Sequence, residues 1–329
     1  MKNRIITKSR VLVTGGAGFI GSGIIEALLD QDNYVVCLDN FATGKRRNIE
    51  TFLRRSNFHL IEGDIRDQND CIKSVDNVEI VLHQAALGSV PRSIHDPVTS
   101  NNVNVGGFVN MLFASKEAGI KRFVYAASSS TYGDHPGLPK TEENIGKPLS
   151  PYAITKYTNE LYGNIFSSLY GIETIGLRYF NVFGKRQDPE GPYAAVIPKF
   201  IKSMIACESP VINGDGTNSR DFTYIKNVVQ INQLAALITE PNAINTIYNV
   251  AFGENTSLNQ LFELLKHYLS EFNPGISNIQ PVYGPPRKGD VLHSLASINK
   301  ARELLGYEPE YDLNKGLEEA IKWYWENLK

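Results

Sequence analysis

Cysteine is scarce in this chain of 329 residues, and the three that occur, Cys37, Cys71 and Cys207, form no CxxC pair. An odd number of widely spaced cysteines argues against a disulfide framework or a zinc site and favours a reducing compartment, the cytoplasm. None of the six histidines stands in a ligand motif such as HExxH. We therefore expect no metal site.

The sequence also lacks a long apolar run and an excess of charge of one sign. No apolar stretch approaches the roughly 18 residues that span a bilayer, and the polar segment 1–10 has no signal-peptide core. The 33 basic and 35 acidic residues give a net charge of −2, which argues against a nucleic-acid partner held by bulk positive charge. Hydrophobic residues make up 42 % of the chain, enough for the packed core of one large domain or two ordinary ones.

Short β-branched strands alternate with amphipathic helices over the first half of the chain. Strands are predicted over 10–14, 34–39, 57–61, 79–83, 122–127 and 174–178, and helices over 20–29, 67–75, 98–118 and 151–170. This alternation is typical of βαβ units and of an α/β fold with a doubly wound parallel sheet. After residue 180 the loops lengthen and carry Pro and Gly. We predict a Rossmann domain over 1–180 and a smaller mixed lobe over 181–329, without a sharp boundary because the chain is expected to cross between the lobes.

Three glycines spaced three apart, Gly15, Gly18 and Gly21, join the first predicted strand to the first helix. They permit a tight turn, a close approach of backbone to a pyrophosphate and close helix–strand packing, and the helix N-terminus attracts phosphate. Asp39 ends the second strand, where a carboxylate would bind the adenosine ribose hydroxyls. The pattern predicts an NAD site, since Asp39 would repel the 2′-phosphate of NADP. The basic cluster 45–47 could bind that phosphate, but it is more simply interpreted as a solvated loop.

Further residues are predicted to line the cofactor at the ends of the next strands. Asp64-Ile65 could pair with the adenine amino group or cap the third strand, and Gln84-Ala85-Ala86 are small enough to let the cofactor pass. The predicted set is completed by residues that adjoin the glycine turn and the second strand: Phe19, Ile20, Asn40 and Gly44.

A candidate catalytic pair follows Ser150-Pro151, a sequence typical of a helix start. Tyr152 and Lys156 lie four residues apart and share one helical face. A cation beside a phenol favours the phenolate, so we expect the pKa of Tyr152 to fall below about 10 and the phenol to act as a base. Ser128 and Ser129 follow the fifth strand and place hydroxyls at the carboxyl edge of the sheet, where such folds bind ligands.

Six motifs spread over nearly the whole chain carry a resemblance to a known family. They are TGGAGFIG (14–21), SSSTYGD (128–134), YxxxK (152–156), LRYFNVFG (177–184), NGDGTNSRDFTYIKNV (213–228) and RKGDVLHS (287–294). With these motifs the chain resembles the extended short-chain dehydrogenases/reductases, in the group of NAD-dependent nucleotide-sugar epimerases and dehydratases. The stretches 88–97 and 148–157 look most similar to the UDP-N-acetylhexosamine 4-epimerases of bacterial surface-polysaccharide pathways.

The resemblance implies a role for each matching residue. Tyr152 would deprotonate the sugar 4-hydroxyl, Ser128 or Ser129 would hydrogen-bond that hydroxyl, and Lys156 would also hold the nicotinamide ribose. Asn104 and the main chain near Tyr179 and Val182 would line the NAD site. The UDP-sugar would be bound by Ser89 at the acetamide or glycosyl phosphate, Asn181 and Arg220 at the diphosphate, Arg287 and Asp290 at the phosphate and uridine ribose, Ser294 beside the sugar C2 substituent, and Ala195 and Asn213 nearby.

The resemblance also narrows the reaction. Related dehydratases keep Asp-Glu, and related decarboxylases keep a Glu, where this chain has Ser129-Ser130. Epimerisation at C4 through a 4-keto sugar is what remains. In the family a bulky Tyr at the position of Ser294 excludes an N-acetyl group, so serine indicates UDP-GlcNAc and UDP-GalNAc as substrates. UDP-glucose, UDP-glucuronate and UDP-N-acetylglucosaminuronate stay open as alternatives, and a non-catalytic dinucleotide-binding scaffold is a remote one.

A homodimer is the expected assembly, again by resemblance. Two helices of each subunit, 98–118 and 151–170, would form a four-helix interface. Leu161, Ile165 and Leu169 on the second helix would suit either this interface or the core.

Overall fold

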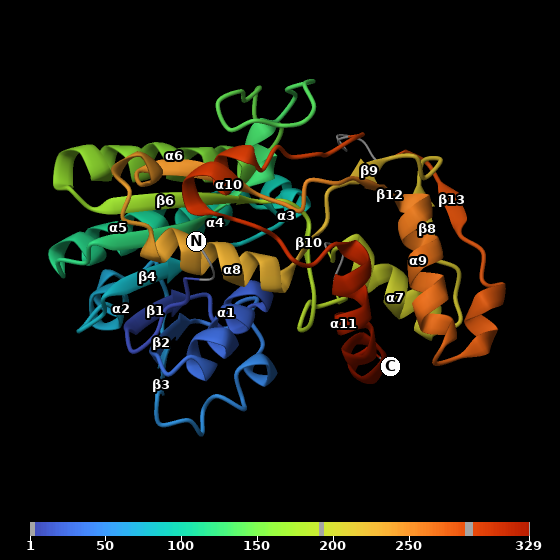
Figure 1. The fold of residues 1–329 in the computed structure, drawn as a ribbon, viewed down its shortest axis with the longest axis horizontal. Coiled ribbons are helices and arrows are strands. Elements are labelled where there is room, and N and C mark those ends of the chain that lie inside the picture. The colour runs from blue at the N-terminus through green and yellow to red at the C-terminus, as the bar shows by residue number, and fades with distance from the viewer. Residues whose placement is uncertain (1–3, 191–193, 287–291, 329) are drawn as a thin grey trace.

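A seven-stranded parallel sheet forms the centre of the larger lobe of the protein (Figure 1). The computed structural model describes residues 4–190, 194–286 and 292–328. The strand order is β11-β6-β5-β4-β1-β2-β3, which adds one strand to the order of a doubly wound dinucleotide-binding sheet. The strands are β1 (Arg10–Thr14), β2 (Tyr34–Asp39), β3 (Phe58–Glu62), β4 (Ile80–His83), β5 (Arg122–Ser128), β6 (Glu173–Tyr179) and β11 (Thr246–Val250). The predicted fold class is confirmed.

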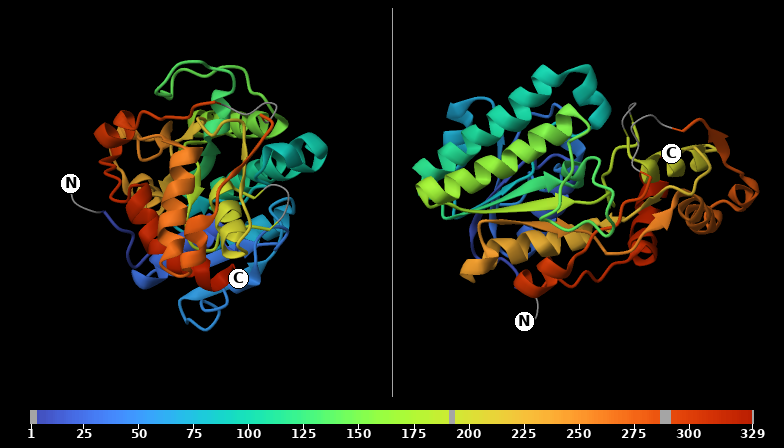
Figure 2. Two further views of the ribbon diagram at one scale, coloured as in Figure 1. Left: turned by 90° about the vertical axis from the view of Figure 1, so that its right-hand side faces the viewer. Right: turned by 90° about the horizontal axis from the view of Figure 1, so that it is seen from above.

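Helices cover both faces of this sheet, which is why its strands are almost continuously apolar. Figure 2 shows one helical layer above the sheet and one below it. One layer holds α2 (Gln68–Ser74), α5 (Phe108–Glu117) and α6 (Pro151–Tyr170), and the other holds α1 (Phe19–Asp30) and α8 (Ile225–Leu237). In the internal strand β1, Val11, Leu12 and Val13 are completely buried.

The helix predicted over 98–118 forms without a break, but its middle is not α-helical. The segment consists of α4 (Pro97–Asn101), a π-helical stretch (Asn102–Gly107) and α5. Gly107 packs so closely on Ile65 that an added Cβ would lie 2.5 Å from that side chain. Asn104 meanwhile binds the backbone of Leu87. The π-helical stretch thus packs tightly against the loops that follow β3 and β4. Such π-helical turns are frequent at functional sites.

The chain crosses between two lobes after β6. The second lobe lies beyond the carboxyl edge of the sheet (Figure 1) and contains α7 (Val196–Ile205), β8 (Val211–Asn213), α9 (Leu258–Ser270), β13 (Val282–Gly284) and α11 (Leu313–Asn327). In contrast, α8, β11 and α10 (Asn299–Leu305) return to the sheet. Short elements near the crossing are α3 (Val90–His95), β7 (Val182–Phe183), β9 (Ser219–Arg220), β10 (Thr223–Tyr224) and β12 (Thr256–Ser257). The boundary at residue 180 stays a prediction. Although α8, β11 and α10 come after that residue, they pack on the sheet of the first lobe.

Among the described residues, no helix is both long enough and apolar enough to cross a membrane. Within the same residues, no group of three or more His, Cys, Asp or Glu side chains could hold a metal ion.

Candidate active site

A pocket opens at the carboxyl edge of the sheet, where β1 and β4 are neighbours and the strand order reverses. Such a switch point is where doubly wound sheets bind dinucleotides. The pocket brings together many of the predicted cofactor residues, namely Gly15, Gly18, Asp39, Asn40, Gly44, Asp64, Ile65, Gln84, Ala85 and Ala86. Its lining also includes residues that the sequence did not indicate, namely Thr43, Arg66, Leu87, Thr99 and Val103.

The glycine turn has no room for side chains. Gly15 has a φ of +67°, and a Cβ there would lie 2.8 Å from the Cα atom of Ala85. A Cβ on Gly21 would lie 2.2 Å from the carbonyl oxygen of Gly15. Helix α1 begins directly after Gly18, so the bare backbone of the turn and the helix N-terminus lie together at the pocket. This arrangement fits a pyrophosphate, and the residues present therefore suit NAD.

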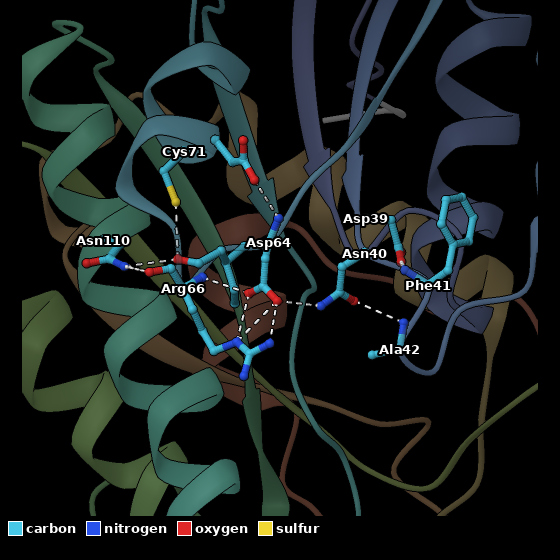
Figure 3. Close-up of polar contacts among 10 residues, drawn as sticks. Asp39, Asn40, Phe41, Ala42, Asp64, Arg66, Cys71 and Asn110 are labelled. Atoms are coloured by element: carbon cyan, nitrogen blue, oxygen red, sulfur yellow. Dashed lines mark hydrogen bonds and ion pairs between the residues drawn. The ribbon is translucent and has the colours of Figure 1, made fainter.

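Asp39 is fixed at the end of β2, as Figure 3 shows. Its Oδ2 accepts a hydrogen bond from the backbone N–H of Ala17 at 2.9 Å, and its Oδ1 accepts one from Phe41 at 2.8 Å. Burial raises the pKa of Asp39, and these two hydrogen bonds act against that shift. Each carboxylate oxygen can accept a second bond. Asp39 is thus held in place and keeps the capacity to accept bonds from ribose hydroxyls.

A second acidic group, Asp64, lies beside Asn40 in the same pocket (Figure 3). Arg66 binds its carboxylate with a shortest distance of 2.6 Å, and the Asn40 amide donates to it at 2.8 Å. These bonds, above all that from Arg66, lower the pKa of Asp64 to about 2. Asn110 on α5 donates to the carbonyl oxygens of Ile65 and Arg66 at 3.1 and 3.0 Å. Asp64 is therefore ionised, and hydrogen bonds fix the loop after β3 at the place where the adenine end of NAD would lie.

The basic cluster 45–47 is partly engaged with carboxylates. Lys45 lies 3.4 Å from Asp188, and Arg46 lies 2.6 Å from Glu62. These pairs favour the interpretation as a surface loop over that as a 2′-phosphate site.

Some predicted cofactor residues lie behind the pocket wall. Asn104 is 1 % exposed. Its amide oxygen accepts from the N–H of Leu87 at 2.7 Å, and its NH2 group donates to the Thr155 hydroxyl at 3.2 Å. It positions the loop that lines the pocket instead of lining the pocket itself. The hydroxyl of Tyr179 donates to Gln84 at 3.0 Å and so braces the same loop. Phe19, Ile20 and Val182 pack against the main core.

The candidate catalytic residues meet where β5 ends and α6 begins. Ser150 caps α6 by accepting a bond from the N–H of Ala153 at 3.1 Å. The hydroxyl of Tyr152 is hydrogen-bonded to Ser128, the last residue of β5. Ser128 itself accepts from the hydroxyl of Ser130 at 2.9 Å. The structure thus joins Tyr152 to Ser128.

The expected fall in the pKa of Tyr152 is wrong for the protein chain by itself. Burial raises this pKa, and the bond with Ser128 only acts against the rise. The Nζ of Lys156 donates to the carbonyl oxygen of Ala126 at 2.7 Å instead of contacting the phenol. Burial lowers the pKa of Lys156 to about 8, with Glu160 acting against it. Desolvation, which disfavours both charged forms, outweighs the attraction between them.

A second pocket adjoins this site and is lined by residues of both lobes. It brings together the predicted substrate residues Ser128, Ser129, Asn181, Arg220 and Ser294. It adds Ser130 and Tyr132 of the motif 128–134, to which no binding role was assigned, and Lys140, which the sequence did not indicate. Arg220 donates to the carbonyl oxygen of Leu292 at 3.2 Å, and the N–H of Ser294 donates to that of Ser219 at 3.1 Å. These bonds hold residues 292–294 against β9.

The other predicted substrate residues have different surroundings. Ser89 caps α3 with a φ of +126°, and its neighbour Val90 lines the second pocket. Asn213 is exposed on β8, next to a separate hollow lined by Gly214 and Tyr283. Ala195 is exposed and precedes α7. Arg287 and Asp290 lie outside the described residues.

Comparison with known proteins agrees with this geometry. Residues 11–251 match the NAD dependent epimerase/dehydratase family. A putative UDP-glucose 4-epimerase of Methanocaldococcus jannaschii is 40 % identical over 95 % of this chain and 97 % of that protein. The structure of a UDP-N-acetylglucosamine 4-epimerase from Methanobrevibacter ruminantium M1 in complex with UDP-N-acetylmuramic acid has a TM-score of 0.90 and 40 % identity, covering 97 % and 99 % of the two chains.

A third relative extends the range of sugars. The structure of a UDP-glucuronic acid 4-epimerase from Bacillus cereus in complex with UDP-glucuronic acid and NAD has a TM-score of 0.85 and 32 % identity, covering 96 % of this chain and 98 % of that one. Family match, relatives and pocket residues agree. The chain therefore belongs to the NAD dependent epimerase/dehydratase family, as its sequence motifs predict.

Proposed function

We propose that this NAD-dependent UDP-sugar 4-epimerase interconverts UDP-GlcNAc and UDP-GalNAc. The observation that carries the proposal is the position of Ser294 in the pocket that Ser128 and Arg220 also line. A serine leaves space at this wall for an N-acetyl group on the sugar, where a tyrosine would occupy it. The same pocket thus contains Ser128, expected at the reacting C4 of the sugar, and Arg220, expected at the diphosphate.

The residues of the chain supply the proton transfer. Tyr152 takes the proton from the sugar 4-hydroxyl, and its bond with Ser128 fixes the phenol at the end of β5. Because the Ser128 oxygen already accepts from the N–H and from the hydroxyl of Ser130, its own hydrogen is left to be donated. The charge of Lys156 favours the phenolate once the proton has moved.

NAD would be held by the glycine turn at its pyrophosphate and by Asp39 at its adenosine ribose. When bound, NAD supplies the acceptor and donor of the hydride at C4. The 4-keto sugar then turns in the pocket so that the opposite face of C4 would receive the hydride, and Tyr152 returns the proton to O4.

The lining of the second pocket supports epimerisation over dehydration. Expelling the 6-hydroxyl needs an acid–base pair, and the residues after Ser128 are Ser129 and Ser130. No carboxylate occurs among the described residues that line this pocket.

We propose further that two subunits pair through α6. Leu161, Ile165 and Leu169 are 51 %, 46 % and 65 % exposed and share one helical face. Val98 on the neighbouring α4 is 68 % exposed. A continuous apolar row of this kind marks an interaction surface. Sedimentation of Leu161→Glu beside the unchanged protein tests the pairing, and an unchanged mass would contradict it.

Proton NMR of the product tests the proposed reaction. The protein is incubated with NAD and either UDP-GlcNAc or UDP-glucose. Rapid conversion of the acetylated sugar to its C4 epimer, with slow conversion of UDP-glucose, is the expected result. Conversion of UDP-glucose alone would keep the mechanism and contradict the role of Ser294.

A further inference from the structure

Lys140 lies in the wall of the second pocket although its side chain is buried. It is 5 % exposed and lines the same pocket as Ser128, Ser129 and Ser294. Lysine is rarely buried to this degree unless it is paired. Its position in the middle of the long loop between β5 and α6 carries no periodic signal by which the sequence could have indicated it.

The backbone fixes Lys140 firmly at this place. Its N–H donates to the carbonyl oxygen of Leu295 at 2.8 Å, and its own carbonyl oxygen accepts from the N–H of Ser297 at 2.9 Å. The amide of Asn249 on β11 donates to the same carbonyl oxygen at 3.0 Å. Lys140 therefore sits against the segment that directly follows Ser294, the proposed substituent-sensing residue.

No carboxylate of the described residues pairs with the ammonium group of Lys140. Among the described residues, Lys140 takes part in none of the ion pairs within 4.0 Å, whereas the buried Arg122 and Arg178 bind Glu173 and Glu160 at 2.6 and 2.8 Å. The Nζ of Lys140 donates to the carbonyl oxygen of His135, and an ammonium has three hydrogens to donate. Burial lowers the pKa of Lys140, as expected for a cation removed from water without an anion.

The anion that would balance this charge can be placed by elimination. Arg220 and Asn181 are assigned to the diphosphate, and Ser128 to the 4-hydroxyl of the sugar. The part of the substrate that these assignments leave for Lys140 is the hexose with its substituents. A carboxylate offsets a buried cation far better than a neutral hydroxyl or amide oxygen does.

We infer that Lys140 binds a carboxylate carried by the hexose, so that the enzyme prefers an acidic UDP-N-acetylhexosamine to the neutral sugar. The inference rests on the proposed 4-epimerase function and extends its substrate class. The carboxylate has two chemical sources, namely oxidation at C6 of the hexose and an acidic ether substituent such as the lactyl group at O3. Both present one negative charge on an N-acetylated ring.

The test compares kcat/KM for three UDP-sugars: UDP-GlcNAc, UDP-N-acetylglucosaminuronate and UDP-N-acetylmuramate. They are assayed with the unchanged enzyme, with Lys140→Met and with Lys147→Met, which removes an exposed lysine from the same loop. In Lys140→Met we expect kcat/KM for the preferred acidic sugar to fall by about tenfold or more, since a charge-assisted bond is lost. The neutral sugar should change by less than about threefold, and Lys147→Met should match the unchanged enzyme. The acid that loses more identifies the source of the carboxylate.

Several outcomes would overturn the inference. An unchanged enzyme that turns over UDP-GlcNAc and neither acidic sugar keeps the 4-epimerase function and removes the role of Lys140. Equal losses for neutral and acidic sugars in Lys140→Met would assign the residue to structure. The variant Lys140→Gln, checked with Lys140→Met for thermal unfolding and NAD content, guards against misfolding. Failure to convert any of the three sugars would instead contradict the proposed function.

Discussion

Lys156 and Tyr152 lie one turn apart on α6, with the Nζ atom of Lys156 6.0 Å from the centre of the Tyr152 ring. Burial disfavours charge on both side chains, since it raises the pKa of Tyr152 and lowers that of Lys156 to about 8. Each charge is therefore most stable when the other is present. A proton taken up by the phenol and a proton held by the ammonium are coupled events, which suits a base that must work in both directions of an isomerisation.

Replacing Tyr152 by Phe removes the proposed base and leaves its ring in place. We expect turnover to fall by about a thousandfold, the middle of the range for general acid–base catalysis. NAD binding and thermal unfolding should stay close to those of the unchanged protein. Tyr157→Phe on the same helix is the matched control and should keep full turnover. A Tyr152→Phe variant with ordinary turnover would contradict the proposed mechanism.

The two candidate serines can be separated by single substitutions. Ser128→Ala removes the bond to Tyr152 and the acceptor of Ser130, so we expect kcat to fall by about one to two orders of magnitude. For Ser129→Ala, which removes no bond to the phenol, we expect kcat to fall by less than about threefold. Initial rates with saturating UDP-GlcNAc measure both. The reverse ranking would assign the 4-hydroxyl to Ser129.

The sequence predicted the parts of the site that repeat a local rule. A strand, a glycine turn and a helix place Gly15 and Gly18 at a phosphate site in any fold of this class. The same holds for Asp39 at a strand end and for the spacing of Tyr152 and Lys156. These features need only neighbours in sequence, and the structure brings them together at the edge of the sheet.

What the sequence missed depends on contacts between distant segments. The position of Lys140 is set by Leu295 and Ser297, and that of Asn104 by the backbone of Leu87. The pKa of Tyr152 follows from burial, which no spacing between residues reveals. The choice between core and interface for Leu161 likewise needed the packing of α6 against its neighbours.

Ser294→Tyr tests the basis of sugar selection. A tyrosine would fill the space proposed for the N-acetyl group, so we expect kcat/KM for UDP-GlcNAc to fall by about tenfold or more, the effect of a steric clash in a packed pocket. UDP-glucose should be converted at least as well as by the unchanged enzyme. The ratio of the two values, measured by NMR, is the readout. A parallel loss for both sugars would show that residue 294 does not sense the C2 substituent.

His83, the last residue of β4, makes a prediction about acid stability. It is buried against Phe108 and Phe123. The hydroxyl of Thr14 accepts from the N–H of Ala85 at 3.2 Å and is hydrogen-bonded to Nδ1 of His83 at 2.9 Å. Burial, helped by the charge of Lys156, lowers the pKa of His83 to about 3. Protonation of His83 therefore makes the stability of the folded protein depend on pH.

The sign of the effect follows from proton binding. Below about pH 6.5 the unfolded chain binds a proton at His83 that the folded protein does not, so stability is complete above that pH and falls as the pH drops toward 3. By pH 4 the loss amounts to about 3 kcal/mol. Urea unfolding at pH 7 and pH 4 should show this loss for the unchanged protein and for His267→Gln, an exposed control. In His83→Gln the free energy of unfolding should fall by about 3 kcal/mol less over the same interval, because the titrating group is gone. Equal losses in all three proteins would mean that His83 accepts its proton in the folded state.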